Sequence, residues 1–93
     1  MLLARVVGNV VATRKDPRLE GKKMLVVQQL APDGGLQDRI VVALDTVGAG
    51  VRETVICVAG SSARMASGMK GTPVDTAVVG IVDDLSLLAR DGP

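Results

Sequence analysis

The chain opens on a regular alternation of residue types. Apolar or small residues occupy every even position from 2 to 12, whereas the odd positions mix aliphatic with polar residues. A period of two predicts a strand over Leu2–Thr13, with one buried face and one mixed face. Gly8 lies in the middle of this segment and predicts a bend or bulge, as in a sheet that curls into a barrel.

Two further apolar segments flank a turn. Met24–Leu30 is apolar on both faces until its two glutamines, and Arg39–Leu44 carries alternating apolar residues on one face. The intervening Ala31–Gly35 contains a proline, which suits the first central position of a turn, and two glycines, which accept the left-handed conformation. We therefore expect these two segments to pair as an antiparallel hairpin.

The second half of the chain predicts two more strands and one helix. The strands are Thr54–Ala59 and Val74–Val82, the latter containing a glycine. Ser61–Met69 is the segment that suits a helix, and glycines at positions 68 and 71 predict its end. The two serines that open it are expected to cap the free N–H groups of the first turn.

This pattern predicts a mainly β fold. Five short strands, a short helix between the fourth and fifth, and glycines inside strands are typical of a small closed or nearly closed barrel. The long first strand favours an OB-like barrel over a sandwich, and the pattern does not give the strand order. We expect residues 1–84 to form a single domain and residues 85–93 to form a C-terminal tail. Its leucines (Leu85, Leu87 and Leu88) either dock on a neighbouring subunit or fray with the tail.

Composition adds an expectation about assembly. The chain has 93 residues, of which 47% are hydrophobic and none is aromatic, and its mean hydropathy is +0.36. A domain of this size buries only about 60–65% of its unfolded surface. The apolar content exceeds what so small an interior holds, which predicts that part of it faces a partner subunit.

Charge and cysteine content limit the possible partners and compartment. The formal net charge of +1 gives no long-range field to attract nucleic acid or an anionic membrane. The single cysteine, Cys57, excludes an internal disulfide and suits a reducing compartment. With no secretory leader pattern and no apolar run long enough to span a membrane, we expect a cytoplasmic protein.

The residues that catalysis or metal binding would need are missing from the sequence. There is no histidine, so Ser61 and Ser62 lack the usual base for nucleophilic catalysis. One cysteine without histidine does not make a zinc site. Gly48-Ala49-Gly50 precedes a strand rather than a helix, so it is not a dinucleotide-binding turn. We therefore expect no catalytic residue, no metal and no cofactor.

The competing hypothesis is a barrel that binds single-stranded nucleic acid or another ligand. Such surfaces combine a basic groove with aromatic side chains on which bases stack. This chain has no aromatic residue, and its one basic segment, residues 14–23, carries a net charge of only +3. The composition therefore favours a protein–protein role.

Several segments at matching intervals resemble the EutN/CcmL-type vertex proteins of bacterial microcompartment shells. The resemblance runs from Met1 to about Asp84. The segments that carry it are Val6–Lys15, Gly21–Val27, Asp45–Gly50, Gly60–Arg64, Pro73–Asp75 and Gly80–Asp83. It implies a non-enzymatic β-barrel that assembles as a homopentamer and caps the vertices of a shell tiled by hexameric proteins, with no nucleic-acid or membrane partner.

The resemblance also implies where the contacts lie. Two glycine-rich segments would face the subunit boundary and the fivefold axis, through Asp45, Val47, Gly48, Ala49, Gly50, Gly60, Ser61, Ser62, Ala63 and Arg64. We expect the Ala49 side chain to border the opening. Contact with the hexameric shell proteins is assigned to the basic loop, through Arg14, Lys15, Arg18 and Lys22.

Arg64 and the tail leave two points open. Arg64 either pairs across the subunit boundary, with Glu53 or Asp45, or is a solvated helix residue. After the Ile81-Val82-Asp83 segment, the sequence departs from the usual family pattern of further glycines and a last short strand.

Overall fold

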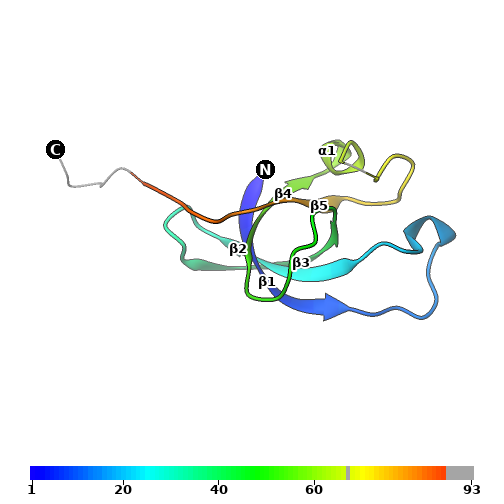
Figure 1. Ribbon diagram of the computed structural model, residues 1–93, viewed down its shortest axis with the longest axis horizontal. Helices are drawn as coiled ribbons and strands as arrows, with labels where there is room; N and C mark the ends of the chain where they lie inside the picture. The colour runs from blue at the N-terminus through cyan, green and yellow to red at the C-terminus, as the bar shows by residue number, and fades with distance from the viewer. Residues whose placement is uncertain (67, 88–93) are drawn as a thin grey trace.

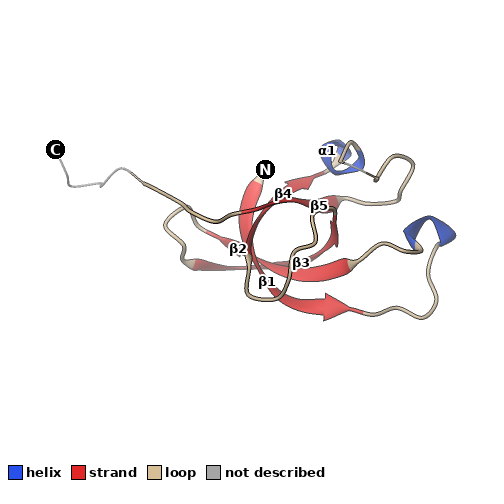
Figure 2. Ribbon diagram, in the orientation of Figure 1, coloured by secondary structure: helices blue, strands red, loops and turns tan. Residues whose placement is uncertain are grey.

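The computed structural model describes residues 1–66 and 68–87, which form a small barrel of strands with loops at its ends (Figures 1 and 2). A turn of 3-10 helix, Pro17–Leu19, lies in the loop after the first strand. The main elements are β1 (Leu2–Val10), β2 (Met24–Leu30), β3 (Leu36–Asp45), β4 (Thr54–Ala59), α1 (Ser61–Arg64) and β5 (Thr76–Ile81).

The five strands close into a barrel in the order β1-β2-β3-β5-β4. Neighbouring strands are antiparallel except β3 and β5, which run parallel over two residue pairs, Leu44 with Ala77 and Asp45 with Val78. The predicted OB-like barrel and the hairpin of the second and third strands are both confirmed.

One apolar cluster fills the barrel. The inward positions of the strands supply all of its buried members except Ala49, which lies in the loop after β3, so the alternation in the sequence marks the others. Without aromatic side chains, aliphatic ones of small and medium size must fill the space. Each fully buried valine or leucine contributes about 1.5–3 kcal/mol, and each alanine contributes less. The buried members are Ala4, Val6, Leu25, Val27, Ala43, Ala49, Val55, Cys57 and Val78.

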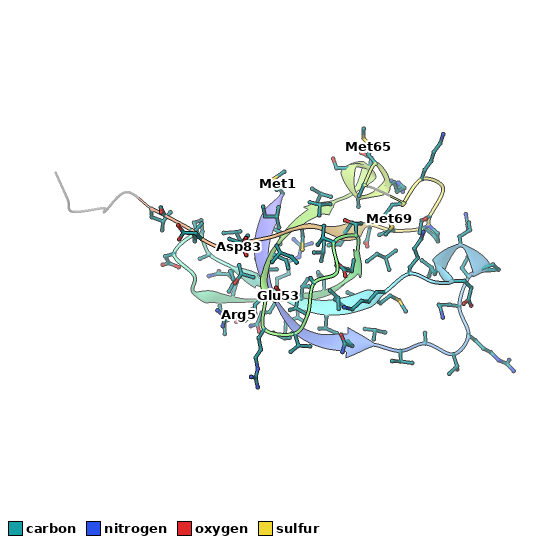
Figure 3. All side chains as sticks on the ribbon, viewed as in Figure 1. Met1, Arg5, Glu53, Met65, Met69 and Asp83 are labelled. Carbon is teal, nitrogen blue, oxygen red and sulfur yellow. The ribbon has the colours of Figure 1, made fainter. Side chains whose placement is uncertain are left out.

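A second cluster lies outside the barrel, under α1 and the segment that follows it. It comprises Leu44, Ala63, Met69, Val74 and Ala77. Figure 3 shows Met65 on the outside of α1 and Met69 on the side toward the barrel, in agreement with their exposed fractions of 86% and 2%. The segment from α1 to Met69 therefore covers this cluster.

The first strand is shorter than predicted but bends where expected. Its pairing with β2 shifts register between Val6 and Gly8, which confirms the irregularity predicted at the glycine. The strand ends at Val10 rather than Thr13, because β2 begins at Met24 and offers no partner beyond the Val10–Met24 pair.

The predicted helix was too long and its capping was wrong. α1 has four residues, Ser61–Arg64; its N-cap is Gly60, in a left-handed conformation (φ 63°), and no side chain caps it. After Arg64 the backbone continues in turns, with Met69 N–H donating to Ala66 and Thr72 N–H donating to Met69. Tight turns place Met69 in the second cluster, where a continued helix would carry it away.

The third and fifth strands also differ at their ends. β3 begins at Leu36 rather than Arg39, since the hairpin turn leads directly into pairing with Leu30. β5 begins at Thr76 rather than Val74, because Val74 is buried in the second cluster and not in the sheet. Within the described ranges, no helix is both long and apolar enough to cross a membrane.

Candidate subunit interface

The loop between β3 and β4 is held by a buried carboxylate. Asp45 ends β3, and its two oxygens accept hydrogen bonds from the backbone N–H groups of Val47 (3.1 Å) and Ala49 (3.0 Å). Its side chain is only 3% exposed. A carboxylate that accepts local backbone N–H groups fixes a turn in one conformation, so the sequence that follows Asp45 forms a preshaped loop.

Contacts of Lys23 and Thr46 fasten this loop to the barrel, and a contact of Glu53 closes the loop on itself. The ammonium of Lys23, the residue before β2, donates to the Ala49 carbonyl at 2.6 Å and lies 4.0 Å from the Asp45 carboxylate. The Thr46 hydroxyl donates to the Val78 carbonyl on β5 at 2.8 Å. Glu53 accepts from the Gly50 N–H at 2.6 Å, close to where the chain enters β4 (Figure 3).

Burial of Ala49 corrects one expectation. Its side chain is fully buried in the core of its own chain, so it does not border an opening. The loop instead presents Val47, which is 40% exposed, and Gly48, whose φ of 77° favours glycine over any residue with a side chain. Small size at Ala49 therefore serves packing within the chain.

Arg52 is the one described non-glycine residue with a positive φ, 79°. Its backbone N–H donates to the Val6 carbonyl at 2.8 Å, and Val6 N–H donates in turn to the Glu53 carbonyl at 2.9 Å. These two bonds to β1 hold Arg52 in a conformation that costs arginine about 1 kcal/mol or more relative to the right-handed regions. No sequence signal marks this position.

The second glycine-rich segment begins where β4 ends. Gly60 N–H donates to the Asp75 carbonyl at 2.8 Å, which ties the start of α1 to the residue before β5. Ser61, Ser62 and Arg64 are exposed, whereas the Ala63 side chain is buried. Ala63 shares the second cluster with Leu44, the residue before Asp45, so the two predicted interface segments flank one apolar cluster.

The candidate partners of Arg64 are occupied within their own chain. Asp45 and Glu53 both accept hydrogen bonds from the loop that they border. Among the described residues, Arg64 forms no ion pair. Pairing across a subunit boundary therefore remains a prediction.

Internal contacts engage most of the basic loop. Arg18 donates to both oxygens of Asp16, at 3.0 and 2.8 Å, and these bonds lower the pKa of Asp16 to about 2. Lys15 lies 3.8 Å from the Glu20 carboxylate, and Lys22 donates to the Gly68 carbonyl at 2.7 Å. Arg14 is exposed and enters none of these contacts.

Nucleophilic and metal-ligating groups do not form a site in the described part of the chain. Cys57 points into the barrel core, and burial raises its thiol pKa to about 11. Across residues 1–66 and 68–87, no three or more Cys, Asp or Glu side chains gather in a way that would hold a metal ion.

Comparison with known proteins identifies the family. The family described as "Ethanolamine utilisation protein EutN/carboxysome" matches residues 1–83. The shell vertex protein PduN of Salmonella typhimurium is 50% identical over 90 residues, covering 92% of this chain and 99% of that protein. The carboxysome shell vertex protein CcmL of Synechocystis is 46% identical over 87 residues, covering 94% and 87%.

A solved structure agrees with these relatives. GrpN of Rhodospirillum rubrum, described as a pentameric microcompartment shell protein, superposes with a TM-score of 0.87 at 43% identity, covering 95% of this chain and 100% of that one. The resemblance seen in the sequence is confirmed. Fold, family match and relatives agree over nearly the whole described chain, which therefore belongs to the EutN/CcmL family.

Proposed function

We propose that this chain forms a closed homopentamer that caps the vertices of a bacterial microcompartment shell in the cytoplasm. The observation that carries the proposal is the match over residues 1–83 to a family whose relatives are named shell vertex proteins. One such relative, 43% identical, is described as pentameric. The role is structural and not enzymatic.

Geometry explains why a shell needs such a component. A sheet tiled by hexamers is flat and closes into a polyhedron only where pentagons are inserted. A ring of five is built from heterologous contacts, in which each copy offers two different surfaces and the rotation closes. In this proposal, hexameric shell proteins form the flat facets, and they are the partners of this chain at the vertices.

The preshaped loop supports a place for the subunit contact. Val47, Gly48, Ser61, Ser62 and Arg64 offer exposed atoms to the neighbouring copy. The remaining members act through backbone shape, because they are buried or carry little or no side chain: Asp45, Ala49, Gly50, Gly60 and Ala63. A bulky Val47→Trp exchange should weaken the ring, and an unchanged ring would contradict this placement.

Contact with hexamers is assigned to the basic loop: Arg14, Lys15, Arg18 and Lys22. Arg14 is the member that enters no internal contact among residues 1–66 and 68–87, which suits it to pair with an acidic surface. Reversal of its charge in Arg14→Glu should reduce co-sedimentation with assembled shell proteins and leave the ring intact. Equal co-sedimentation would remove the basic loop from the contact.

The native mass of the purified chain tests the proposal directly. Five copies of the 9.6 kDa chain give about 48 kDa. Native mass spectrometry should find this species in neutral volatile buffer, with light scattering as an independent check. A stable monomer across the micromolar range would contradict the proposed role, and a hexamer would remove the curvature argument.

A further inference from the structure

β3 is the longest strand, and much of one edge has no partner. It pairs with β2 from Leu36 to Leu44, whereas its other edge pairs with β5 only at Leu44 and Asp45. Within the described part of the chain, residues 36–43 therefore have no strand on that side. Figure 2 shows the hairpin of β2 and β3 projecting beyond the rest of the barrel. Such an edge is a template for pairing with another chain.

The outer face of the same strand is apolar around Ile40 and Val42, whereas residues 37–39 before them are exposed and polar. Ile40 and Val42 are 55% and 48% exposed, while Val41 and Ala43, which alternate with them, pack against or lie within the core. Leu36, at the start of the strand, is 55% exposed. On β2, the half-buried Val26 lies opposite Val42 and extends this apolar face.

A groove continues the face where β3 and β5 separate. It has a volume of about 200 Å³ and runs between Val42–Leu44 and the segment from Pro73 to Thr76, with Leu19 and Met24 also in its lining. Exposed large apolar residues also occur elsewhere among the described residues: Val7 on β1 and, outside the strands, Met1, Val11, Val47, Val51, Met65, Leu85 and Leu87. The β3 surface combines a rigid apolar face, an open edge and an adjoining groove.

We infer that this β3 surface, defined as Leu36, Ile40 and Val42 with the open edge of residues 36–43, is covered by a second copy of this chain. The inference rests on the proposed ring, in which every copy must offer two different surfaces. β3 leads directly into the loop at Asp45, so the surface is continuous with the proposed axial contact.

Charge on the surface also suits a second copy. Asp38 and Arg39 are the ionisable residues of segment 36–43, and they cancel. A nearly neutral surface matches a chain whose own net charge is +1 better than it matches a polyanion or an anionic membrane. The second copy thus covers an apolar face and an edge that would otherwise promote aggregation.

The test compares two substitutions of similar chemistry. Ile40→Lys and Val11→Lys each exchange an exposed aliphatic side chain for a charged one, and Val11, 89% exposed, lies just after β1. We expect Ile40→Lys to raise the concentration at which rings dissociate by about tenfold or more, as for a central contact residue. Val11→Lys should leave it within about twofold of the unmodified chain.

Two further measurements separate loss of the contact from loss of the fold. Circular dichroism should show the barrel intact in the Ile40→Lys monomer, and the milder Ile40→Thr, which keeps a β-branched side chain, should weaken the ring in the same direction. A ring unaffected by either Ile40 substitution, or equally weakened by Val11→Lys, would overturn the inference and leave the pentamer standing. A monomeric unmodified chain would instead overturn the proposed function.

Discussion

At the residue scale, the loop after β3 depends on one carboxylate. Asp45 accepts two backbone hydrogen bonds from a nearly buried position, with the Lys23 ammonium 4.0 Å away. Removing this acceptor leaves the Ala49 N–H, which is part-buried, and the Val47 N–H, which is exposed, without their partner. The loss at the part-buried group exceeds the value of a hydrogen bond in water.

We therefore expect Asp45→Ala to lower the free energy of unfolding by about 2 kcal/mol or more, measured by urea unfolding at one protein concentration. Asp33→Ala is the matched control. Asp33 also accepts a backbone N–H, from Gly35 at 2.9 Å, but in an exposed turn. Asp33→Ala should lower the free energy of unfolding by less than about 1 kcal/mol. Similar losses in both variants would show that burial of Asp45 adds nothing.

The Cys57 thiol predicts a pH dependence. Burial raises its pKa from 9.0 to about 11, so the unfolded chain loses this proton at a lower pH than the folded chain does. Between these values the folded state binds more protons, and stability must fall as the pH rises. The melting temperature should decrease from pH 9 to pH 11.

Cys57→Ala supplies the reference for this titration. Other groups also titrate in this range, and the variant retains them while lacking the thiol. Its melting temperature should therefore decrease less steeply over the same interval. Parallel curves for the two proteins would contradict burial of the thiol as the cause.

Predictions from apolar periodicity succeeded at the residue scale. Other residue-level predictions failed where a small residue fits two different structural roles. Ala49 between two glycines is as compatible with a narrow opening as with a tight core, and the structure shows the core. Ser61 and Ser62 have the composition of caps, yet Gly60 takes that position. Lys23 fastens the loop through a contact between distant segments, and nothing in the sequence distinguishes it from Lys22.

At the scale of elements, local signals decided which boundaries were predictable. β2 and β4 have the predicted bounds, because turn residues or a change in polarity stand at their ends. β3 extends further back because paired backbone, not apolar alternation, defines its polar beginning. The predicted helix, Ser61–Met69, was longer than α1. The turns after Arg64 bury residues at spacings that a helix also allows, so the sequence pattern did not distinguish the two.

Glycines within these elements should respond differently to alanine. A Cβ at Gly8 would lie 3.7 Å from the nearest atom of Val26, an ordinary contact, and its backbone is not left-handed. Gly8→Ala should be neutral or stabilise by up to about 1 kcal/mol, through the lower entropy of the unfolded chain. Gly48 has open space around it but a φ of 77°, so Gly48→Ala should cost about 1–2 kcal/mol.

Thermal unfolding of both alanine variants at equal concentration tests this distinction. If Gly8→Ala proved the more harmful exchange, the β1 irregularity would need glycine for a reason other than space or φ. Both positions were equally prominent in the sequence, so their difference comes only from the structure.

At the scale of the molecule, barrel closure was predictable as a class but not as a topology. Strand number, length and internal glycines indicate a small barrel. The order of strands depends on the two parallel pairs between β3 and β5, which join segments far apart in the chain. Pairing over only two positions leaves no pattern in the sequence. The open edge of β3 that results from it could not be predicted from the sequence either.

Assembly should make the stability of the chain depend on its concentration. A ring of five binds folded copies only, so mass action raises the melting temperature as concentration rises. For a hundredfold increase we expect a shift on the order of 10 °C in a domain of this size. Differential scanning calorimetry at about 2 and 200 µM would measure this shift.

The Ile40→Lys variant should lose most of this dependence on concentration if the β3 surface is covered in the ring, whereas Val11→Lys should retain it. A melting temperature independent of concentration in the unmodified chain would mean that the barrel is stable alone, and the excess of apolar residues would then need another explanation.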